Sequence, residues 1–295
     1  MSSHAIIVLG AGAIGSTYGA LLSSKNKVTL IGRTAHMKSI TKNGLTISGS
    51  VNDTYFLAAE TEIEEIPPNA LILLTTKAQD AARTIEGIKP LLRKDSTILV
   101  LQNGLGIKEV VEKIVDDKAE IIRGLVTSAA ELLEPGKVSF WQGETILEPT
   151  QSSHAIARVF VESGLKTRIS NDIKSEIWQK LILNCVVNPL TAILRARNHE
   201  ILAGNLKGIR HAIIQECTTI AQSEELLFET GLEECIEQKI AGYTNYSSMY
   251  QDIAKQRKTE IDFINGKIVE LGRRHSIPTP VNEALVALIK YLEAR

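Results

Sequence analysis

The spacing of hydrophobic and polar positions changes near residue 170. Upstream, short apolar runs typical of buried parallel strands alternate with amphipathic stretches, and these runs are 5–9, 28–31, 70–75, 97–101 and 121–127. Downstream, the spacing is helical almost throughout, and the expected helices are 173–196, 200–225, 233–242, 249–272 and 280–294. The pattern therefore predicts an α/β domain over residues 1–170, followed by an all-α domain over residues 171–295.

Two further pairs of short runs surround polar turns and are expected to form antiparallel strands: 44–48 with 54–58 at the sheet edge, and 138–141 with 144–147. Pro189 is expected to kink or break its helix, because proline supplies no N–H and its ring crowds the preceding turn. Thr279 and Pro280 are typical of a helix start, with the threonine as N-cap.

The first apolar run leads into a GxGxxG motif, Gly10-Ala11-Gly12-Ala13-Ile14-Gly15, which precedes a helical stretch and a second strand. In this context Gly10 makes the tight turn, Gly12 lets the backbone approach a pyrophosphate, and Gly15 lets the helix pack closely on the strand. The helix start then offers unpaired N–H groups to the phosphates. A glycine-rich turn without a ligand is the alternative, but the strand–loop–helix context favours dinucleotide binding in a Rossmann-type domain.

The second strand ends at Ile31-Gly32-Arg33-Thr34, where an NAD site usually has an Asp or Glu for the ribose 2′-hydroxyl. This chain has none there. A guanidinium suits a 2′-phosphate, which it can bind with two donors. Arg33 therefore favours NADPH over NADH, and a solvated loop charge is its alternative interpretation.

Two polar residues directly follow predicted parallel strands. Lys77 follows the run at 70–75, and Asn103 follows the run at 97–101. Ligands of open α/β sheets bind at the carboxyl ends of the strands, so both are candidate site residues. Each also has a plain alternative, because Asn103-Gly104 is an ordinary turn dipeptide and Lys77 suits a loop.

The helix predicted at 173–196 contains a thin polar stripe in apolar surroundings. Within WQKLILNCVVNPL, the polar residues Lys180, Asn184 and Asn188 recur every four positions, which places them on one helical face. Buried amides and ammonium groups are costly unless they are hydrogen-bonded. The stripe therefore indicates either a small polar ligand, or a contact with another element or with solvent.

The segment 245–252 lies at another predicted helix start. Ser248 and Gln251 fit the capping box S-x-x-Q, while a helix start with Ser and Asn side chains also suits a carboxylate ligand. A charged stretch follows at 255–262, and its periodicity does not distinguish Glu260 from neighbouring surface charges.

Composition narrows the class of protein. The chain has 295 residues, 44% hydrophobic and 23% charged, which is ordinary for a globular protein, and its net charge of −1 gives no general affinity for nucleic acid or anionic membranes. Three cysteines without CxxC spacing fit a reducing compartment and indicate no metal site. Without a basic leader, or an apolar run near the roughly 20 residues of a membrane span, a cytoplasmic soluble protein is expected.

Together these motifs resemble the ketopantoate reductase (2-dehydropantoate 2-reductase) family over essentially the whole chain. The matching segments are GAGAIG at 10–15, TTKAQD at 75–80, QNGLG at 102–106, WQKLILNCVVNPLTAI at 178–193, NYSSMYQDI at 245–253 and RKTEIDFINGKIVELGRRHSIPTP at 257–280. The central and C-terminal motifs are long and specific, whereas many dehydrogenases share GxGxxG. Gln102 departs from the family, whose members often have His before the NG pair, and this departure is not expected to change the reaction.

The resemblance implies reduction of 2-dehydropantoate to (R)-pantoate by NADPH, on the route to pantothenate and coenzyme A, in a cleft between the two domains. It implies that Lys180 is the catalytic acid and that Glu260 works beside it. The implied substrate-binding residues are Asn103, Asn184, Asn188, Asn198, Asn245 and Ser248, with a weaker match around Asn198. The implied cofactor contacts are the loop Gly10, Ala11, Gly12, Ala13, Ile14 and Gly15, together with Arg33, Lys77, Asn103, Ala130 and Glu260.

The chemistry of the residues supports the same mechanism as a hypothesis. Hydride transfer to a ketone builds negative charge on its oxygen, which a protonated Lys180 can stabilise and protonate. Amides at 184 and 188 can fix the keto acid, and a carboxylate such as Glu260 can keep the lysine charged.

Two other functions are considered: an NADPH-dependent reductase of a different 2-keto acid, and a non-catalytic NADP-binding sensor. The combination of Lys180, Asn184 and Glu260 argues against the sensor. A small keto acid is the expected partner, with neither nucleic acid nor membrane, and the apolar helices of the second domain favour a homodimer.

Overall fold

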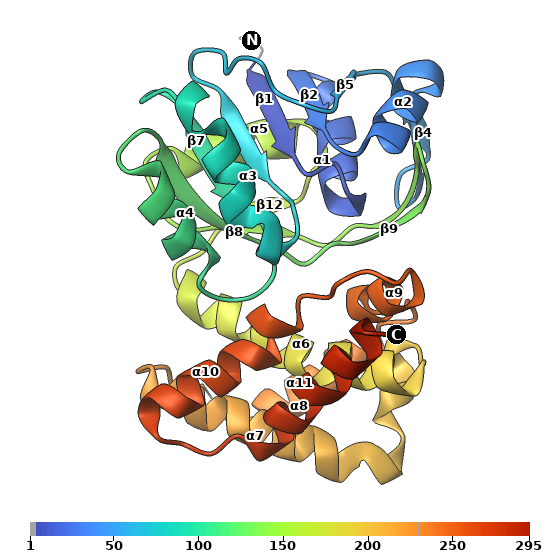
Figure 1. Cartoon of the computed structure of the whole chain (residues 1–295), viewed down its shortest axis with the longest axis vertical. Coiled ribbons are helices and arrows are strands. Elements are labelled where there is room, and N and C mark those ends of the chain that lie inside the picture. The colour runs from blue at the N-terminus through green and yellow to red at the C-terminus, as the bar shows by residue number, and fades with distance from the viewer. Residues whose placement is uncertain (1–3, 229) are drawn as a thin grey trace. The chain divides into compact units, whose positions relative to one another are not determined.

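The computed structural model describes residues 4–228 and 230–295, which form two compact units whose elements are labelled in Figure 1. Unit 1 contains the residues up to Gln102 and the range Gly106–Ile173, and unit 2 contains Asn103–Leu105 and Lys174–Arg295. An α/β unit is thus followed by a helical unit, which confirms the expected fold class. The short turn Asn103–Leu105 belongs to unit 2, although both of its flanks belong to unit 1.

The main sheet of unit 1 has the strand order β12-β11-β8-β7-β6-β1-β2-β5. Its strands are β1 (Ala5–Leu9), β2 (Lys27–Ile31), β5 (Ala58–Glu60), β6 (Leu71–Leu74), β7 (Thr97–Val100), β8 (Glu120–Val126), β11 (Thr145–Leu147) and β12 (Thr167–Ile169). Six neighbouring strands of this sheet, β5-β2-β1-β6-β7-β8, are parallel and have the Rossmann order. The strand order reverses direction between β1 and β6. A dinucleotide site is therefore expected where the loops after β1 and β6 meet.

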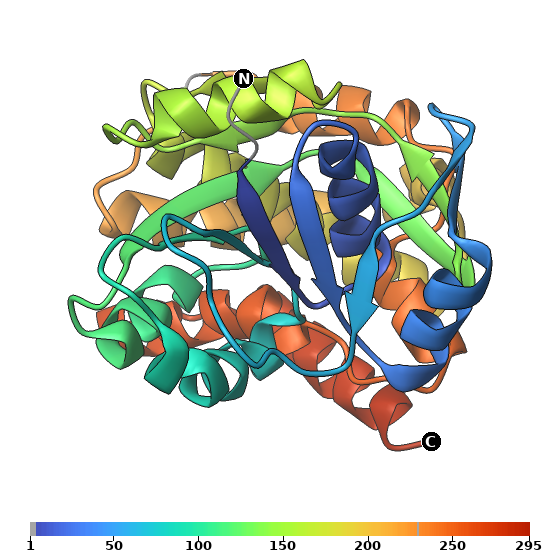
Figure 2. The ribbon, with the colours of Figure 1, turned by 90° about the horizontal axis from the view of Figure 1, so that it is seen from above.

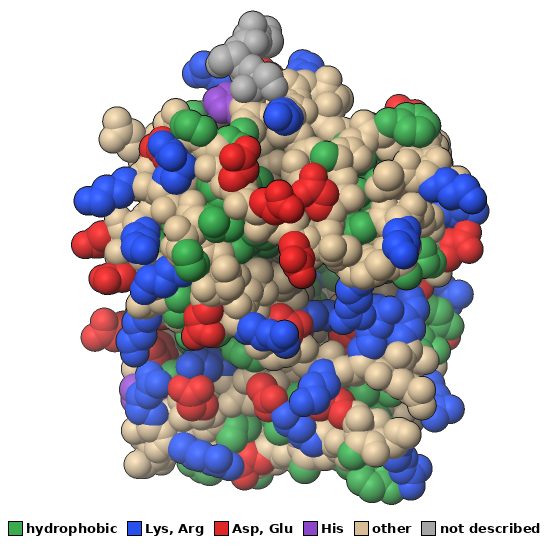
Figure 3. Space-filling model, turned by 45° about the horizontal axis from the view of Figure 1, so that its top comes forward, with side chains coloured by type: hydrophobic (Ala, Val, Ile, Leu, Met, Phe, Trp, Pro, Cys, Tyr) green, Lys and Arg blue, Asp and Glu red, His purple; other side chains and the backbone are tan. Residues whose placement is uncertain are grey.

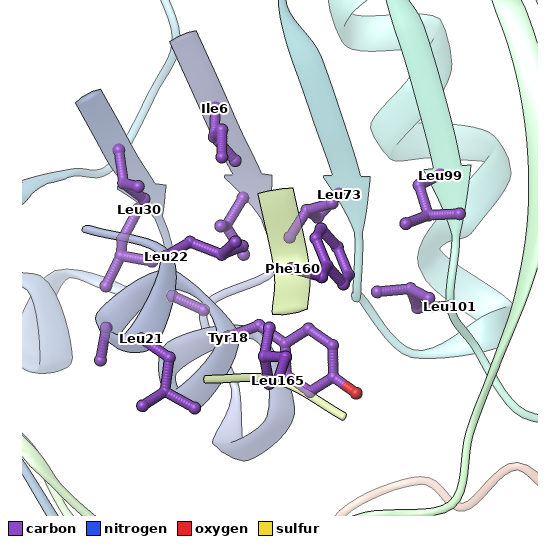
Figure 4. Close-up of a cluster of buried hydrophobic side chains, with 14 of the residues drawn as sticks. Ile6, Tyr18, Leu21, Leu22, Leu30, Leu73, Leu99, Leu101, Phe160 and Leu165 are labelled. Atoms are coloured by element: carbon purple, nitrogen blue, oxygen red, sulfur yellow. The ribbon is translucent and has the colours of Figure 1, made fainter. Parts of the chain in front are cut away.

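Helices cover both faces of this sheet (Figure 2). Helices α1 (Ala13–Ser23) and α5 (Ser153–Glu162) lie on one side, α3 (Ala81–Ile88) and α4 (Ile107–Val115) lie on the other, and α2 (Thr34–Asn43) follows β2. Because successive strand residues point to opposite faces, Ile6 and Val8 of β1 enter the core under α1. Figure 4 shows Tyr18 of α1 beside Phe160 of α5 in this core, and their rings meet edge-on with centroids 6.0 Å apart.

A second, four-stranded sheet corrects two expectations. It consists of β3 (Leu45–Gly49), β4 (Asp53–Tyr55), β9 (Ala129–Glu134) and β10 (Lys137–Trp141) in the order β4-β3-β10-β9. The hairpin of β3 and β4 exists, but in this sheet and not at the edge of the main one. The expected pairing of β10 with β11 is wrong, because β10 pairs with β3 and β9 while β11 pairs with β8 and β12. The chain changes sheets at Gly143, where a Cβ would lie 2.6 Å from Thr127 Oγ1.

Unit 2 is built around one central helix. Its helices are α6 (Ile173–Leu194), α7 (Lys207–Ser223), α8 (Leu232–Ala241), α9 (Ser248–Ala254), α10 (Asn265–His275) and α11 (Pro280–Glu293), with short 3-10 turns η3 (Asn198–Leu202), η4 (Gly204–Leu206) and η5 (Ile261–Phe263). By length and composition α6 is apolar enough to cross a membrane. However, 67% of its most apolar window is buried inside the protein, as in the core helix of a globular domain.

Three helix predictions need correction. The expected helix 249–272 is interrupted, because α9 ends at Ala254, Gln256 adopts a φ of 50°, and the Glu293 carboxylate accepts hydrogen bonds from the N–H (2.7 Å) and hydroxyl (2.6 Å) of Thr259. The expected helix 200–225 starts instead as η3 and η4, which are joined at the extended residue Ala203. Of the two effects expected of Pro189, a kink or a break, the break is absent, because α6 continues to Leu194.

One of the two expected helix caps shifts, whereas Thr279 is the N-cap of α11 and Pro280 its first residue, as expected. The N-cap of α9 is Ser247, one residue before Ser248, and its Oγ accepts the N–H of Tyr250 at 3.0 Å. At α11 the Thr279 side chain makes no capping hydrogen bond, and the Glu216 carboxylate accepts the first N–H groups of that helix instead.

Candidate active site

A hydrogen-bonded chain links three of the predicted site residues within unit 2. The Lys180 ammonium donates to Asn103 Oδ1 at 2.8 Å, and Asn103 Nδ2 donates to the Glu260 carboxylate at 3.3 Å. The orientation of the Asn103 amide follows from its partners, because an ammonium can only donate and an ionised carboxylate can only accept. Glu260 is only 6% exposed, so its charge is largely removed from water.

The polar stripe of α6 continues beyond Lys180. Asn184 is half-buried and Asn188 is 5% exposed. Among residues 4–228 and 230–295, neither of these two side-chain amides has a hydrogen-bond partner. One and two turns beyond the lysine, these amides therefore leave their donors and acceptors available to a small polar ligand.

Asn198 and Asn245 lie side by side although 47 positions separate them. The Asn198 N–H donates to the Asn245 carbonyl at 3.1 Å, and the Asn245 side chain donates to the Tyr246 carbonyl at 3.0 Å. Asn198 is 4% exposed, and its Oδ1 has no hydrogen-bond partner within the described residues. Ser248 differs, since it is exposed in the first turn of α9.

Two buried residues that the sequence motifs did not single out hold this region in place. Arg210 on α7 donates to the Ile201 carbonyl at 2.7 Å and to the Glu237 carboxylate at 2.6 Å, and thereby fixes the turn that contains Asn198. Thr191 lies on α6, and its hydroxyl is 2.7 Å from the Ser247 Oγ. In the sequence, the structural roles of Arg210 and Thr191 are indicated only by the occurrence of a charged and a polar residue within predicted helices.

The glycine loop of unit 1 has the shape of a phosphate-binding turn. Gly10 has a φ of +102°, and a Cβ there would lie 2.4 Å from the backbone nitrogen of Thr76 after β6. At Gly15 a Cβ would lie 2.4 Å from the Gly10 carbonyl, so these two glycines are required by packing. At Gly12 the nearest atom to a Cβ is 3.9 Å away, which leaves the N-terminus of α1 open to a ligand.

Three other candidates for cofactor contact also lie in unit 1. Arg33 directly precedes α2; it is exposed, and in the described ranges its guanidinium has no ion pair or hydrogen bond. Lys77 is half-buried directly before a 3-10 turn (Ala78–Asp80) that follows β6. Ala130 lies in β9, in the second sheet, and packs on the core cluster that Ala13 and Ile14 also border.

Gln102, the departure from the family pattern, is 5% exposed at the end of β7. Its amide nitrogen Nε2 donates to Thr76 Oγ1 at 3.4 Å, while its Oε1 has no partner in the part of the chain that the structure describes. The residue therefore borders the loops after β6 and β7.

The face that Figure 3 shows has both basic and acidic side chains. Lys and Arg side chains occur there together with Asp and Glu, in agreement with the net charge of −1.

Comparison with known proteins follows the same division of the chain. A family model described as ketopantoate reductase PanE/ApbA matches residues 6–151, and one described as ketopantoate reductase PanE/ApbA C terminal matches residues 172–293. A protein from Pyrococcus horikoshii named 2-dehydropantoate 2-reductase is 38% identical, with 98% of this chain and 97% of that protein covered.

Two solved structures extend the comparison. A PanE/ApbA family ketopantoate reductase from Ralstonia eutropha JMP134 has a TM-score of 0.90 at 28% identity, and D-mandelate dehydrogenase with NADH and anilino(oxo)acetate has a TM-score of 0.89 at 30% identity, each with 98% of both chains covered. Because the family models match both halves and the relatives match the whole length, the chain belongs to the ketopantoate reductase PanE/ApbA family of dinucleotide-binding oxidoreductases.

Proposed function

We propose that the protein reduces 2-dehydropantoate to (R)-pantoate with NADPH, and that Lys180 is the general acid. The observation that supports this most directly is the hydrogen-bonded chain from Lys180 through Asn103 to the buried carboxylate of Glu260. The choice of substrate is supported by the Pyrococcus horikoshii relative, which is named 2-dehydropantoate 2-reductase.

The acid role follows from what an ammonium in this setting can do. A ketone oxygen gains negative charge as the carbonyl carbon is reduced, and a nearby ammonium can stabilise that charge and then donate its proton. One of the three N–H donors of Lys180 is used by Asn103, which holds the side chain in one direction. The Glu260 carboxylate accepts from Asn103 Nδ2, which turns the Asn103 Oδ1 toward the Lys180 ammonium.

The substrate would be held by the amides of unit 2. A 2-keto acid with a hydroxyl group presents a carboxylate, a ketone and an alcohol, which together need several donors and at least one acceptor. Asn184 and Asn188 each offer both, and the Asn198 Oδ1 is a buried acceptor that lacks a partner among the described residues. Hydrogen bonds from such groups would hold the keto acid with its carbonyl in the orientation that the reaction needs.

The residues of unit 1 fit NADPH. The open N-terminus of α1 beside Gly12 suits the pyrophosphate, and the exposed Arg33 guanidinium at the start of α2 suits a 2′-phosphate. When bound, the nicotinamide supplies the hydride. The protein contributes the proton at Lys180 and the orientation of the keto acid.

A different 2-keto acid is the second candidate substrate, and one comparison favours it. D-mandelate dehydrogenase, at 30% identity, is structurally as similar to this chain as the Ralstonia eutropha ketopantoate reductase is, and its structure contains NADH and anilino(oxo)acetate. An aromatic keto acid and NADH therefore belong in the first assay.

The test is a steady-state assay that follows cofactor absorbance, with 2-dehydropantoate or an aromatic 2-keto acid as substrate, and with NADPH or NADH. We expect the highest kcat/KM for 2-dehydropantoate with NADPH. A higher kcat/KM for the aromatic acid would replace the substrate and keep the reaction, whereas tight cofactor binding without turnover of any keto acid would refute the enzymatic function.

Lys180→Ala tests the acid. The loss of a positioned acid typically costs about 10²–10⁴-fold in rate, so kcat should fall by that amount while the Kd of NADPH changes little. Lys267→Ala is the matched control, because Lys267 on α10 forms an ion pair with the exposed Glu270 on its own helix. If the Lys180 variant retained most of its kcat, another group would have to be the acid.

A further inference from the structure

Helix α6 contains a buried carbonyl that its own backbone cannot satisfy. In an uninterrupted helix the N–H of residue 189 would bond to the carbonyl of Cys185, but Pro189 has no N–H. Asn265, the first residue of α10, supplies the missing donor: its Nδ2 lies 3.0 Å from the Cys185 carbonyl oxygen. Cys185 and Asn265 are both fully buried, so bulk water does not replace this donor.

Two acceptors, the Cys185 carbonyl and the Asn282 Oδ1, each orient the Asn265 amide, and a relay from the half-buried Glu216 positions the second of them. The Glu216 carboxylate on α7 accepts the backbone N–H groups of Val281 (2.8 Å) and Asn282 (3.0 Å) and also the Asn282 Nδ2 (2.7 Å). The Asn282 Oδ1 must then face Asn265, and it accepts a hydrogen bond from the Asn265 Nδ2 at 2.9 Å. Both N–H groups of Asn265 are thus used, one for Asn282 and one for Cys185.

This contact joins the two segments that supply the proposed acid and its carboxylate. Cys185 follows Asn184 on the helix of Lys180, while Asn265 comes five positions after Glu260. Phe263 lies between Glu260 and Asn265 in the sequence, and its carbonyl accepts the N–H of Leu105, two residues after Asn103. A shift of α6 along or around its axis would therefore break the Asn265 bond and displace Lys180 relative to Asn103.

We propose that Asn265 is a positioning residue for the reaction, which acts through the carbonyl that Pro189 leaves open and holds the Lys180 face of α6 in register with the Glu260 segment. This inference rests on the proposed function of Lys180. The proline matters because its missing N–H, which would weaken an isolated helix, creates the attachment point for α10.

The test is a mutant cycle of Asn265→Leu and Pro189→Ala in the full-length protein. Asn265→Leu should lower kcat by about 10- to 100-fold, because a misplacement of about 1 Å can cost about 10²-fold in rate, and the Kd for NADPH should not change. Pro189→Ala alone should be nearly as active as the wild type. The double variant should regain most of the lost kcat, because an alanine at position 189 has the N–H that the Cys185 carbonyl needs.

Asn282→Leu is the matched control, since it removes the neighbouring amide of the relay but leaves the Asn265–Cys185 bond. It should lower the melting temperature without a comparable loss of kcat, and Pro189→Ala should not rescue it. Equal losses of kcat in the two leucine variants, or no rescue of Asn265→Leu, would overturn the proposal.

The melting temperatures provide a second readout. If Asn265→Leu does not fold alone, a folded and active double variant supports the proposal, and an unfolded double variant overturns it. If the wild type reduces no keto acid, the function of Lys180 fails, and recovery of the melting temperature in the double variant still tests the Cys185–Asn265 bond.

Discussion

Replacing Arg33 by alanine should separate the affinities for the two nicotinamide cofactors. Arg33 is exposed and makes no ion pair or hydrogen bond within residues 4–228 and 230–295, so its loss should leave the stability of unit 1 unchanged. A hydrogen bond to a charged group contributes about 1.5–3 kcal/mol, and exposure to solvent places Arg33 near the lower end, at about 1.5–2 kcal/mol. This corresponds to a rise of about 10- to 30-fold in the Kd of NADPH.

The measurement is a fluorescence titration of NADPH and NADH, which needs no keto acid and does not depend on the substrate. The Kd of NADH should stay constant, because NADH has no 2′-phosphate. Lys38→Ala is the matched control, because Lys38 is an exposed cation on α2, the helix that Arg33 precedes. A parallel rise for both cofactors, or no rise for NADPH, would refute the role of Arg33 at the 2′-phosphate.

The other predictions concern the loop and the fold of unit 1. Gly12→Ala should weaken NADPH binding without changing the melting temperature. Gly15→Ala should lower the melting temperature, because its Cβ would lie 2.4 Å from the Gly10 carbonyl. A lower melting temperature for Gly12→Ala than for Gly15→Ala would contradict the open N-terminus of α1. Burial lowers the pKa of His36, whose Nδ1 accepts the Gly136 N–H, so the unfolded chain binds more protons. The contribution of His36 to the free energy of unfolding should therefore be fully present above the ordinary histidine pKa of about 6.5 and be lost as the pH falls below it. In urea unfolding, the free energy of unfolding should depend less on pH in this acid range for His36→Gln than for the wild type. An equal pH dependence of the two proteins would exclude His36 as the cause.

The parts of the fold that could be predicted are those with local determinants. The apolar run of β1, the glycine loop and the start of α1 are close together in the sequence, and spacing alone describes them. The second sheet could not be predicted, because one of the two partners of β10 is β3, which lies far earlier in the chain. A short apolar segment contains no information about which of several edges it will join.

The site shows the same limit. The spacing of Lys180, Asn184 and Asn188 predicts a shared face, since i, i+4 and i+8 are neighbours on any helix. Glu260 could not be distinguished from the charges before it, because its burial belongs to a break in the helical pattern, where Thr259 donates to Glu293, 34 positions later in the chain. The resemblance to a family identified Glu260, and the physical reason is visible only in the tertiary structure.

The turn Asn103–Leu105 limits how the two halves of this protein can be exchanged between relatives. A recombinant chimera joined at residue 170 would combine Lys180 and Glu260 from one parent with Asn103 from the other, although all three belong to unit 2. A gene fragment for residues 171–295 would likewise encode every helix of that unit and omit the amide between lysine and glutamate. Residues 171–295 alone are therefore not the complete helical unit, because unit 2 also contains the turn Asn103–Leu105.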